Sequence, residues 1–138
     1  MYSNKAMNIQ EPINIAIVDD HFLYKKGLKL AFSYYKDINV LFDAENGLHL
    51  LSQLEKVEPH VILLDLQMSV MDGIAALHEI KKNYPRIKVI ILSMNGEDSM
   101  VAKLRNLGAD SYLTKNSDPR QMYKEIRDVM NSTAHFAE

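Results

Sequence analysis

The sequence predicts one α/β domain in which a five-stranded parallel sheet carries helices on both faces, a doubly wound arrangement. Five short runs rich in Ile, Val and Leu recur along the chain, and between them apolar residues stand three or four positions apart. Strands that alternate with helices in this way form parallel sheets. A chain of 138 residues that is 47% hydrophobic and 25% charged also fits one hydrophobic core.

The five apolar runs are the strand candidates, and they occupy residues 13–18, 38–42, 61–64, 88–92 and 111–113. The third and fourth runs are apolar at nearly every position, as expected of strands that are covered on both faces. For a doubly wound sheet of this size we expect the strand order 2-1-3-4-5, which is the flavodoxin-like arrangement.

Helical spacing in each connection places its apolar residues on one face. Asp118 and Pro119 predict the start of the last helix, as its N-cap and first residue, while Pro85 and Gly108 follow helix ends. The residues expected to face the core from the five helices are Tyr24, Leu28, Ala31 and Phe32; Leu48, Leu51 and Leu54; Ile74, Leu77 and Ile80; Val101 and Leu104; and Met122, Ile126, Val129 and Met130.

Two further groups have ordinary structural interpretations. Asp72 and Gly73 are typical of a turn followed by a helix start. Lys25, Lys26 and Lys29 lie on the first helix, where we interpret them as a solvated face, with contact to a kinase as the alternative.

The domain is expected to occupy residues 13–131. Residues 1–12 are polar and aperiodic, which indicates a flexible N-terminal tail, and residues 132–138 lose the helical spacing, which indicates a linker or C-terminal tail. No apolar run approaches the roughly 20 residues that a membrane span needs. We therefore expect no membrane partner and a cytoplasmic location.

Composition argues against several kinds of site. The chain has no cysteine, which excludes disulfides and thiolate zinc sites and fits a reducing compartment. Its five histidines, at positions 21, 49, 60, 78 and 135, show no metal-ligand spacing. The formal charge of −2 lacks the basic excess that nucleic-acid backbones require, so we expect no direct nucleic-acid binding by this segment.

Polar residues directly follow four of the five apolar runs, and in a parallel sheet they share one rim. Ligands bind at the carboxyl ends of such strands, where strand order reverses, which here is between the first and third strands. Clustered carboxylates repel one another, and a hard divalent ion such as Mg²⁺ balances them. The residues on this rim are Asp19, Asp20, Asp65, Ser93, Thr114 and Lys115.

This set of side chains suits phosphoryl transfer. A carboxylate held by a metal ion and Lys115 can attack phosphorus, and the same cations stabilise the acyl phosphate that forms. Ser93 offers a hydroxyl donor to a phosphate oxygen. Taken singly, each residue has a simpler interpretation, since Asp19 and Asp20 could cap the first helix and Lys115 could be a solvated turn residue.

Four motifs resemble those of response-regulator receiver domains. They are IVDDH at 17–21, LLDLQMSVMDG at 63–73, ILSM at 91–94 and GADSYLTK at 108–115. The resemblance runs from about residue 13 to residue 130, and the four motifs stand in the right order at the right strand ends. The segments IVDDHFLYKKGLKLAF and LSMNGED are especially similar to receivers that precede LuxR-type helix-turn-helix domains.

The resemblance implies a role for each residue of the rim. Asp65 is the implied phosphoacceptor. Mg²⁺ is implied to bind the carboxylates of Asp20 and Asp65 and the backbone carbonyl of Gln67, with Asp19 acting through water. Lys115 is implied to contact a phosphoryl oxygen. The domain would then be a phosphoacceptor signalling module with self-phosphorylation and autodephosphorylation chemistry rather than an enzyme with its own substrate.

The resemblance also implies a switch and partners. Ser93 moves toward the new phosphate, Tyr112 follows it inward, and the surface of the fourth helix, fifth strand and fifth helix changes. The implied phosphodonor is a sensor histidine kinase or a phosphotransfer protein, and a second copy of the chain is a further candidate partner. The implied output is transcription, through a DNA-binding domain outside this chain.

Two positions depart from the family pattern. Ser69 stands where proline is usual, so the loop after Asp65 lacks one fixed φ angle. Met94 stands where a small residue is common, and a bulky side chain there could narrow access for the phosphodonor or for attacking water.

Two other functions compete with this interpretation. A phosphatase of the haloacid-dehalogenase type uses a similar strand-end Asp, Ser or Thr, and Lys, but needs a second acid two residues after the nucleophile. Gln67 occupies that position. A receiver-like interaction module that is never phosphorylated is the third hypothesis, which the intact Asp65, Ser93 and Lys115 set disfavours.

Overall fold

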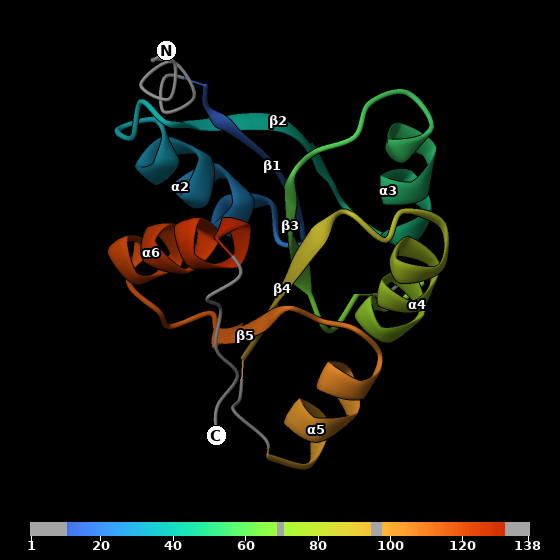
Figure 1. The fold of residues 1–138 in the computed structure, drawn as a ribbon. Helices are drawn as coiled ribbons and strands as arrows, with labels where there is room; N and C mark the ends of the chain where they lie inside the picture. The colour runs from blue at the N-terminus through green and yellow to red at the C-terminus, as the bar shows by residue number, and fades with distance from the viewer. Residues whose placement is uncertain (1–10, 69–70, 95–97, 132–138) are drawn as a thin grey trace.

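The computed structural model of the chain describes residues 11–68, 71–94 and 98–131. Its strands form one parallel sheet in the order β2-β1-β3-β4-β5, which confirms the predicted order (Figure 1). The elements are β1 (Ile13–Val18), α2 (Phe22–Phe32), β2 (Ile38–Ala44), α3 (Gly47–Leu54), β3 (Val61–Asp65), α4 (Gly73–Asn83), β4 (Lys88–Ser93), α5 (Asp98–Asn106), β5 (Ser111–Thr114) and α6 (Pro119–Met130).

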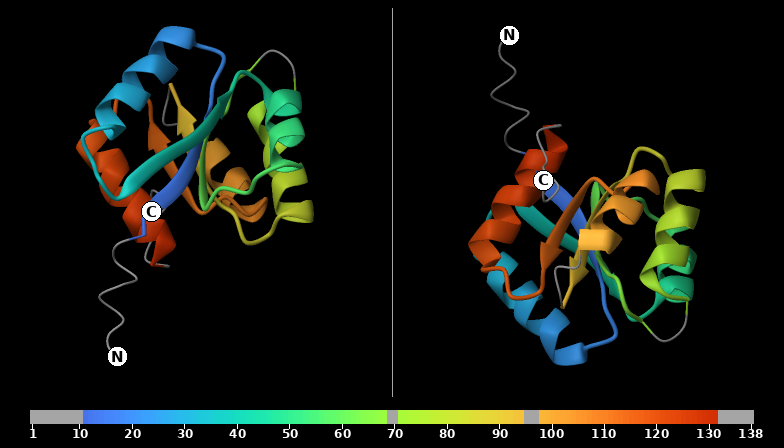
Figure 2. Two further views of the ribbon diagram at one scale, coloured as in Figure 1. Left: turned by 90° about the horizontal axis from the view of Figure 1, so that it is seen from above. Right: turned by 90° about the horizontal axis from the view of Figure 1, so that it is seen from below.

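Helices cover both faces of the sheet, as predicted. Helices α2 and α6 lie on one face, and α3, α4 and α5 lie on the other (Figures 1 and 2). Alternate strand residues enter the two cores: Leu63 packs on the α2 and α6 side, whereas Ile62 and Leu64 pack on the opposite side. Because both faces are buried, the central strands are apolar at successive positions rather than alternately.

The predicted helix boundaries at polar residues are confirmed. The side chain of Asp118 caps α6, and Gln121 completes a capping box with Pro119 at the first helical position. The carboxylate of Asp72 accepts a hydrogen bond from the Ala75 N–H at the start of α4. Gly108, just after α5, has φ of 104°, a left-handed conformation that glycine adopts without a steric penalty.

Four local predictions are wrong, and one of them is Met130, which is exposed rather than in the core. Strand β2 continues two residues further, because Asp43 and Ala44 pair with the end of β1. Lys25 is buried rather than solvated, with Nζ 3.3 Å from Asp43 Oδ1, since α2 turns this residue toward β2. Leu48 is exposed, and Leu50 takes the core position in α3 instead. The longer β2 and the burial of Lys25 both come from contacts with a neighbouring element.

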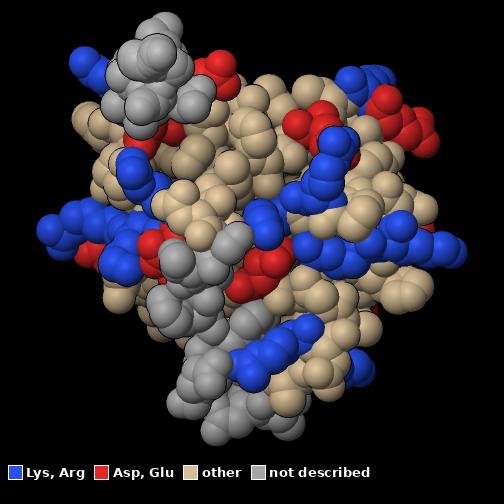
Figure 3. Space-filling view, viewed as in Figure 1, with Lys and Arg blue, Asp and Glu red and all other residues tan. Residues whose placement is uncertain are grey.

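The surface carries charges of both signs. Lysines and arginines are interspersed with aspartates and glutamates over the face seen in Figure 3. Among the described residues, no helix has the length and apolar character required to cross a membrane.

Candidate functional site

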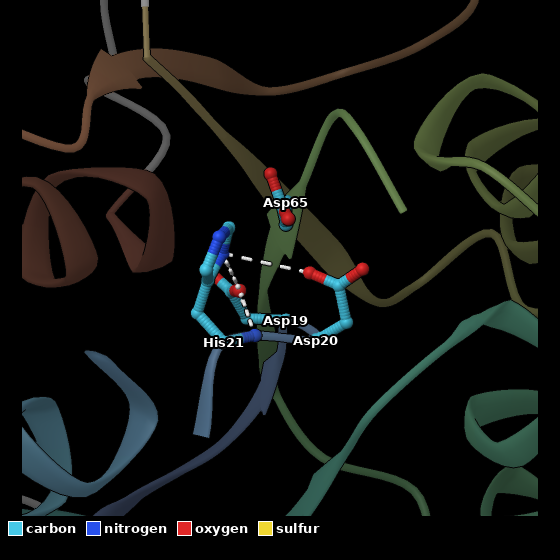
Figure 4. A group of neighbouring side chains, drawn as sticks. All are labelled: Asp19, Asp20, His21 and Asp65. Carbon is cyan, nitrogen blue, oxygen red and sulfur yellow. Dashed lines mark hydrogen bonds and ion pairs between the residues drawn. The ribbon is translucent and has the colours of Figure 1, made fainter. Parts of the chain in front are cut away.

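The acidic residues predicted to share a rim do lie together. Asp19 and Asp20 follow β1, and Asp65 ends β3 beside them (Figure 4). One ligand atom from each of these three residues and from His21 lies within 4.8 Å of the others. Asp19 is 1% exposed and Asp65 is 3% exposed, whereas Asp20 reaches the surface. The sheet therefore brings two buried carboxylates and one accessible carboxylate to a single point.

Lys115 places its ammonium group against both buried carboxylates. It follows β5, its side chain is 5% exposed, and its Nζ lies 2.6 Å from Asp19 Oδ2 and 3.4 Å from Asp65 Oδ2. This is the fixed positive charge that the sequence predicted for the rim. Its closer partner is Asp19, so Lys115 bridges the two carboxylates rather than pairing with Asp65 alone.

Backbone hydrogen bonds fix the loops that carry these side chains. The Asp19 N–H donates to Ala44 O at 3.0 Å, and the Lys115 N–H donates to Ser93 O at 2.7 Å. Gly73 brings α4 close to the loop after β3, because a Cβ at this position would lie 2.5 Å from the Asp65 carbonyl oxygen. The first residue of α4 must therefore be glycine if the helix is to approach the Asp65 backbone this closely.

The buried carboxylates are incompletely satisfied. Asp65 Oδ1 accepts a hydrogen bond from the Gln67 N–H at 3.2 Å, and Asp19 Oδ1 accepts one from the His21 N–H at 2.8 Å. The second oxygen of each carboxylate is buried and accepts no hydrogen bond of acceptable geometry, despite its proximity to Lys115. Burial, followed by the charge of Asp19, raises the pKa of Asp65 above its usual value.

These features fit a hard divalent cation. All three acidic residues offer oxygen ligands, which Mg²⁺ prefers, and two of those oxygens are buried without a hydrogen bond. Two carboxylates facing a single ammonium leave negative charge in excess, which a cation would offset. The side chain of Gln67 is exposed, and its predicted ligation through the backbone carbonyl stays a prediction.

The predicted switch residues line a pocket beside the acidic cluster. Ser93 and Tyr112 are both buried and share a pocket of about 370 Å³ with Gln67 and Met68. The Tyr112 ring belongs to the core cluster on the α4 and α5 side. The movement of Ser93 and Tyr112 on phosphorylation stays a prediction.

A second hollow has Lys115 in its wall. It is a groove of about 610 Å³ whose walls include Asp20, Phe22, Leu23 and Met94. Met94 is exposed in this groove, and its effect on access stays a prediction. Ser69, the other departure from the family pattern, lies outside the described residues.

Two residues of the site were missed in the sequence. The His21 ring has Nδ1 3.1 Å from Asp19 Oδ1 and 3.5 Å from Asp20 Oδ1, although no histidine spacing pointed to it (Figure 4). Tyr24, expected to face the core, lies with its ring centroid 4.9 Å from Lys115 Nζ. The one available signal was their place close after the acidic pair, His21 as the N-cap of α2 and Tyr24 in its first turn.

Tyr24 has the third buried polar atom without a partner. Among the described residues, the buried side-chain oxygens that lack a hydrogen bond are Tyr24 Oη, Asp19 Oδ2 and Asp65 Oδ2. Burial and the charges of Asp19 and Asp65 raise the pKa of Tyr24 to about 12. The hydroxyl therefore stays protonated and remains a hydrogen-bond donor.

Comparison with known proteins identifies the family. The family model for the response regulator receiver domain matches residues 15–127. This chain belongs to that family. The membership agrees with the resemblance seen in the four motifs, and it favours the receiver over the phosphatase hypothesis.

Curated relatives are response regulators. The chain is 31% identical over 133 residues to the transcriptional regulatory protein DegU of Brevibacillus brevis, which covers 96% of this chain and 56% of DegU. It is 33% identical over 125 residues to the response regulator protein VraR of Staphylococcus saprophyticus, which covers 91% of this chain and 60% of VraR. The chain thus spans somewhat more than half the length of these relatives.

Solved receiver domains have the same fold. The receiver domain of NarL from Mycobacterium tuberculosis is 28% identical and superimposes with a TM-score of 0.81, over 88% of this chain and 98% of that one. The non-phosphorylated receiver domain of RcsB from Escherichia coli gives a TM-score of 0.86 at 24% identity, over 93% of this chain and 100% of that one. The expected likeness to receivers of LuxR-type regulators is confirmed.

Proposed function

We propose that this receiver domain accepts one phosphoryl group on Asp65 and thereby controls an output, which the relatives suggest is transcription. The observation that carries the proposal is the pair of buried carboxylates, Asp19 and Asp65, whose second oxygens meet Lys115 but accept no hydrogen bond. Two buried carboxylates that share a single ammonium keep negative charge in excess, which indicates a role in binding a cation and a charged ligand.

The chemical step is a phosphoryl transfer. An Asp65 carboxylate oxygen bonds to phosphorus while the bond from phosphorus to the leaving group breaks, so the donor departs with the electron pair of that bond. With a phosphohistidine donor the leaving imidazole nitrogen takes up a proton, and with acetyl phosphate the leaving group is acetate. Lys115, 3.4 Å from Asp65 Oδ2, is placed to balance charge on the phosphoryl oxygens.

Asp19, Asp20 and Asp65 would hold Mg²⁺, with Gln67 contributing its backbone carbonyl. When bound, the ion supplies charge neutralisation for the transferring phosphoryl group. Asp19 keeps Lys115 in place through the 2.6 Å contact, and the Gln67 N–H orients the acceptor by its hydrogen bond to Asp65 Oδ1. These two contacts position the acceptor and the ammonium before any donor arrives.

The proposed response runs through Ser93 and Tyr112. Both line the pocket next to the acidic cluster, so a hydroxyl drawn toward a phosphoryl oxygen would alter the packing of the neighbouring ring. We propose that this change is passed to the surface formed by α5, β5 and α6. If the phosphoryl group makes better contacts in one conformation of the domain, phosphorylation shifts the equilibrium toward that conformation by the difference in interaction free energy.

The proposed partners follow from the same chemistry. The phosphodonor is a sensor histidine kinase or a phosphotransfer protein, a second copy of the chain is a further partner, and the location is the cytoplasm. The chemistry includes self-phosphorylation by small donors and autodephosphorylation. Met94, exposed in the groove beside Lys115, is proposed to slow the entry of water or donor.

The test is labelling with a small phosphodonor. Purified protein is incubated with MgCl₂ and acetyl phosphate, and intact mass is followed with time. We expect a gain of one phosphoryl group that is base-labile, and no gain in Asp65→Asn. Asp72→Asn is the matched control, because this nearby exposed carboxylate caps α4 and asparagine caps equally well.

Three outcomes distinguish the hypotheses. One labile phosphoryl group that needs Asp65 supports the receiver function. Turnover of many phosphomonoesters without a stable adduct would favour a phosphatase. Folded protein that stays unlabelled with acetyl phosphate and with phosphoramidate would instead favour an interaction module.

A further inference from the structure

Lys115 reaches its two carboxylates from a distant strand. It follows β5, and in the sheet order β3 and β4 separate β5 from β1, whose end carries Asp19. The ammonium nevertheless lies 2.6 Å from Asp19 Oδ2 and 3.4 Å from Asp65 Oδ2. A lysine has a flexible four-carbon stem, so its charge stays at one point only if contacts fix the stem and the ammonium. Those contacts decide where the positive charge stands relative to the acceptor.

The two carboxylates alone leave the ammonium free to move. Asp19 is the nearer partner, and because the attraction between charges grows as they approach, it draws the ammonium away from Asp65. Lys115 also borders the groove that Asp20 and Met94 line, where water would solvate the charge. Yet the side chain of Lys115 is only 5% exposed. A further group therefore closes its surroundings.

The Tyr24 ring is such a group. Its centroid lies 4.9 Å from Lys115 Nζ, a distance at which the negative face of an aromatic ring attracts a cation. Tyr24 and Lys115 both line the groove beside the acidic cluster. An aliphatic side chain could cover the lysine stem equally well, but only an aromatic face also attracts the charge. The identity of the residue at this position therefore bears on where the ammonium stands.

Asp19 ties the ring and the ammonium to the same point. Its Oδ2 meets Lys115 Nζ, and its Oδ1 accepts a hydrogen bond at 2.8 Å from the N–H of His21, the N-cap of α2. Tyr24 lies in the first turn of that helix, where the Lys25 N–H donates to His21 O at 3.1 Å. The contacts thus close a circuit that runs from Asp19 through the start of α2 and the Tyr24 ring to Lys115, and back to Asp19.

A simpler interpretation is that Tyr24 only fills the core. The ring does pack against the core cluster on the α2 and α6 side, as a phenylalanine or a leucine would. Burial, followed by the charges of Asp19 and Asp65, raises the pKa of Tyr24 to about 12, so the ring stands in the field of both carboxylates. It stays neutral and adds no third negative charge to the site. A purely apolar role does not account for this placement beside the only charges that meet Lys115 Nζ among the described residues.

We propose that Tyr24 is a positioning residue for phosphoryl transfer, whose ring holds the Lys115 ammonium between Asp19 and Asp65. The inference rests on the proposed function, because it assigns a role within that reaction. Tyr24 acts through Lys115 rather than on the phosphoryl group. Without the ring, the ammonium spends more of its time against Asp19 or in the groove, and the transition state gains less from its charge.

Substitutions at position 24 test the role of the ring face. Initial labelling rates with MgCl₂ and acetyl phosphate are measured by intact mass. Tyr24→Phe keeps an aromatic face and should stay within about two-fold of the wild-type rate. Tyr24→Leu should be labelled about 3- to 30-fold more slowly, the range that one cation–π contact supplies. Pentafluorophenylalanine at position 24 keeps the shape of the ring but reverses the charge of its face, so it should be as slow as Tyr24→Leu.

A double-mutant cycle shows whether the effect runs through Lys115. In the Lys115→Met background, Tyr24→Leu should cause no further slowing, because the cation is gone. A crystal structure of Tyr24→Leu should show Nζ farther than 3.4 Å from Asp65 Oδ2. Tyr123→Leu is the matched control, because the Tyr123 ring on α6 has the Arg127 guanidinium 5.8 Å from its centroid. This control should be labelled at the wild-type rate at a temperature where every variant is folded.

The outcomes separate the positioning role from the function on which it rests. If the wild type is labelled, but Tyr24→Leu and the fluorinated ring react as fast as Tyr24→Phe, the positioning role is wrong and the receiver function stands. Equal slowing by Tyr24→Leu in the wild-type and Lys115→Met backgrounds would also overturn it, because Tyr24 would then act by another route. A folded wild type that acetyl phosphate and phosphoramidate never label would overturn the proposed function and the positioning role together.

Discussion

Lysines at the two ends of the strands meet their carboxylates in different ways. At the carboxyl ends, Lys115 meets two carboxylates whose second oxygens accept no hydrogen bond. At the amino ends of β4 and β5, Lys81 lies 2.8 Å from Asp110 Oδ2 and also donates to Ile87 O at 2.7 Å. The same Asp110 oxygen accepts a hydrogen bond from the Val89 N–H at 2.8 Å.

The difference separates a structural ion pair from a ligand site. Around Lys81 the charges are paired and hydrogen-bonded, so the cluster ties α4 to the sheet. Around Lys115 two buried carboxylates share one ammonium, so negative charge stays in excess and lowers stability unless a cationic ligand balances it. We therefore expect the same kind of substitution to have opposite consequences at the two ends.

The largest effect is expected from Lys115→Met. Removing the ammonium that faces Asp65 should slow labelling by acetyl phosphate by about 100-fold or more, the range for loss of one preorganised charge-stabilising donor. The Lys81→Met variant should be labelled at the wild-type rate, at a temperature where the variant and the wild type are both folded. Intact-mass time courses measure this. Equal slowing in both variants would mean that the two clusters do not differ in function.

Asp110→Ala should destabilise the fold by about 1–3 kcal/mol. The substitution leaves Lys81 without its carboxylate and the Val89 N–H without its acceptor, and partial exposure of the pair reduces the penalty from that of a fully buried one. Urea denaturation measures the free energy of unfolding. A change within error of zero would contradict a structural role for this pair.

Asp65→Asn should stabilise the metal-free protein by about 1 kcal/mol, or roughly 3–5 °C in Tm. Burial raises the pKa of Asp65, so the native state holds the proton more tightly than the unfolded state. The free energy of unfolding of the wild type therefore falls as pH rises from 3.8 to the raised pKa of the folded protein. In EDTA, Asp65→Asn should be no more stable than the wild type at acid pH and should become the more stable protein as pH rises toward neutral.

Mg²⁺ should reverse this order. A cation that binds the native state raises Tm in proportion to the logarithm of its concentration above the dissociation constant. Wild-type Tm should rise with MgCl₂, whereas that of Asp65→Asn should rise much less. Choline chloride at equal ionic strength controls for general salt effects. An equal response of both proteins would argue against a metal site at Asp65.

The smallest effect is expected from Tyr24→Phe. Loss of a buried hydroxyl without a partner should stabilise the fold by up to about 1 kcal/mol at neutral pH. Because folding raises the pKa of Tyr24 from 10.0 to about 12, the folded state disfavours the ionised ring, and the wild type loses further stability as pH rises from 10 to 12. The gap between Tyr24→Phe and wild type should widen over that range in thermal melts.

Much of the site could be predicted from the sequence because the relevant signals are local. A polar residue directly after an apolar strand lies at the strand end whatever the rest of the chain does, which placed Asp19, Asp65 and Lys115 on one rim. Alternation of strands and helices likewise predicted the layers, and the flavodoxin-like arrangement supplied the strand order. Helix capping by Asp72 and Asp118 depends on neighbouring residues only.

What only the tertiary structure decided depends on distances between elements. The closer approach of Lys115 to Asp19 than to Asp65 follows from how β5 and β1 lie across the sheet, which no spacing along the chain encodes. The same holds for the Tyr24 ring beside that ammonium and for the burial of Lys25 against β2. Sequence periodicity fixes which way a side chain faces, but packing between elements fixes which partner it meets.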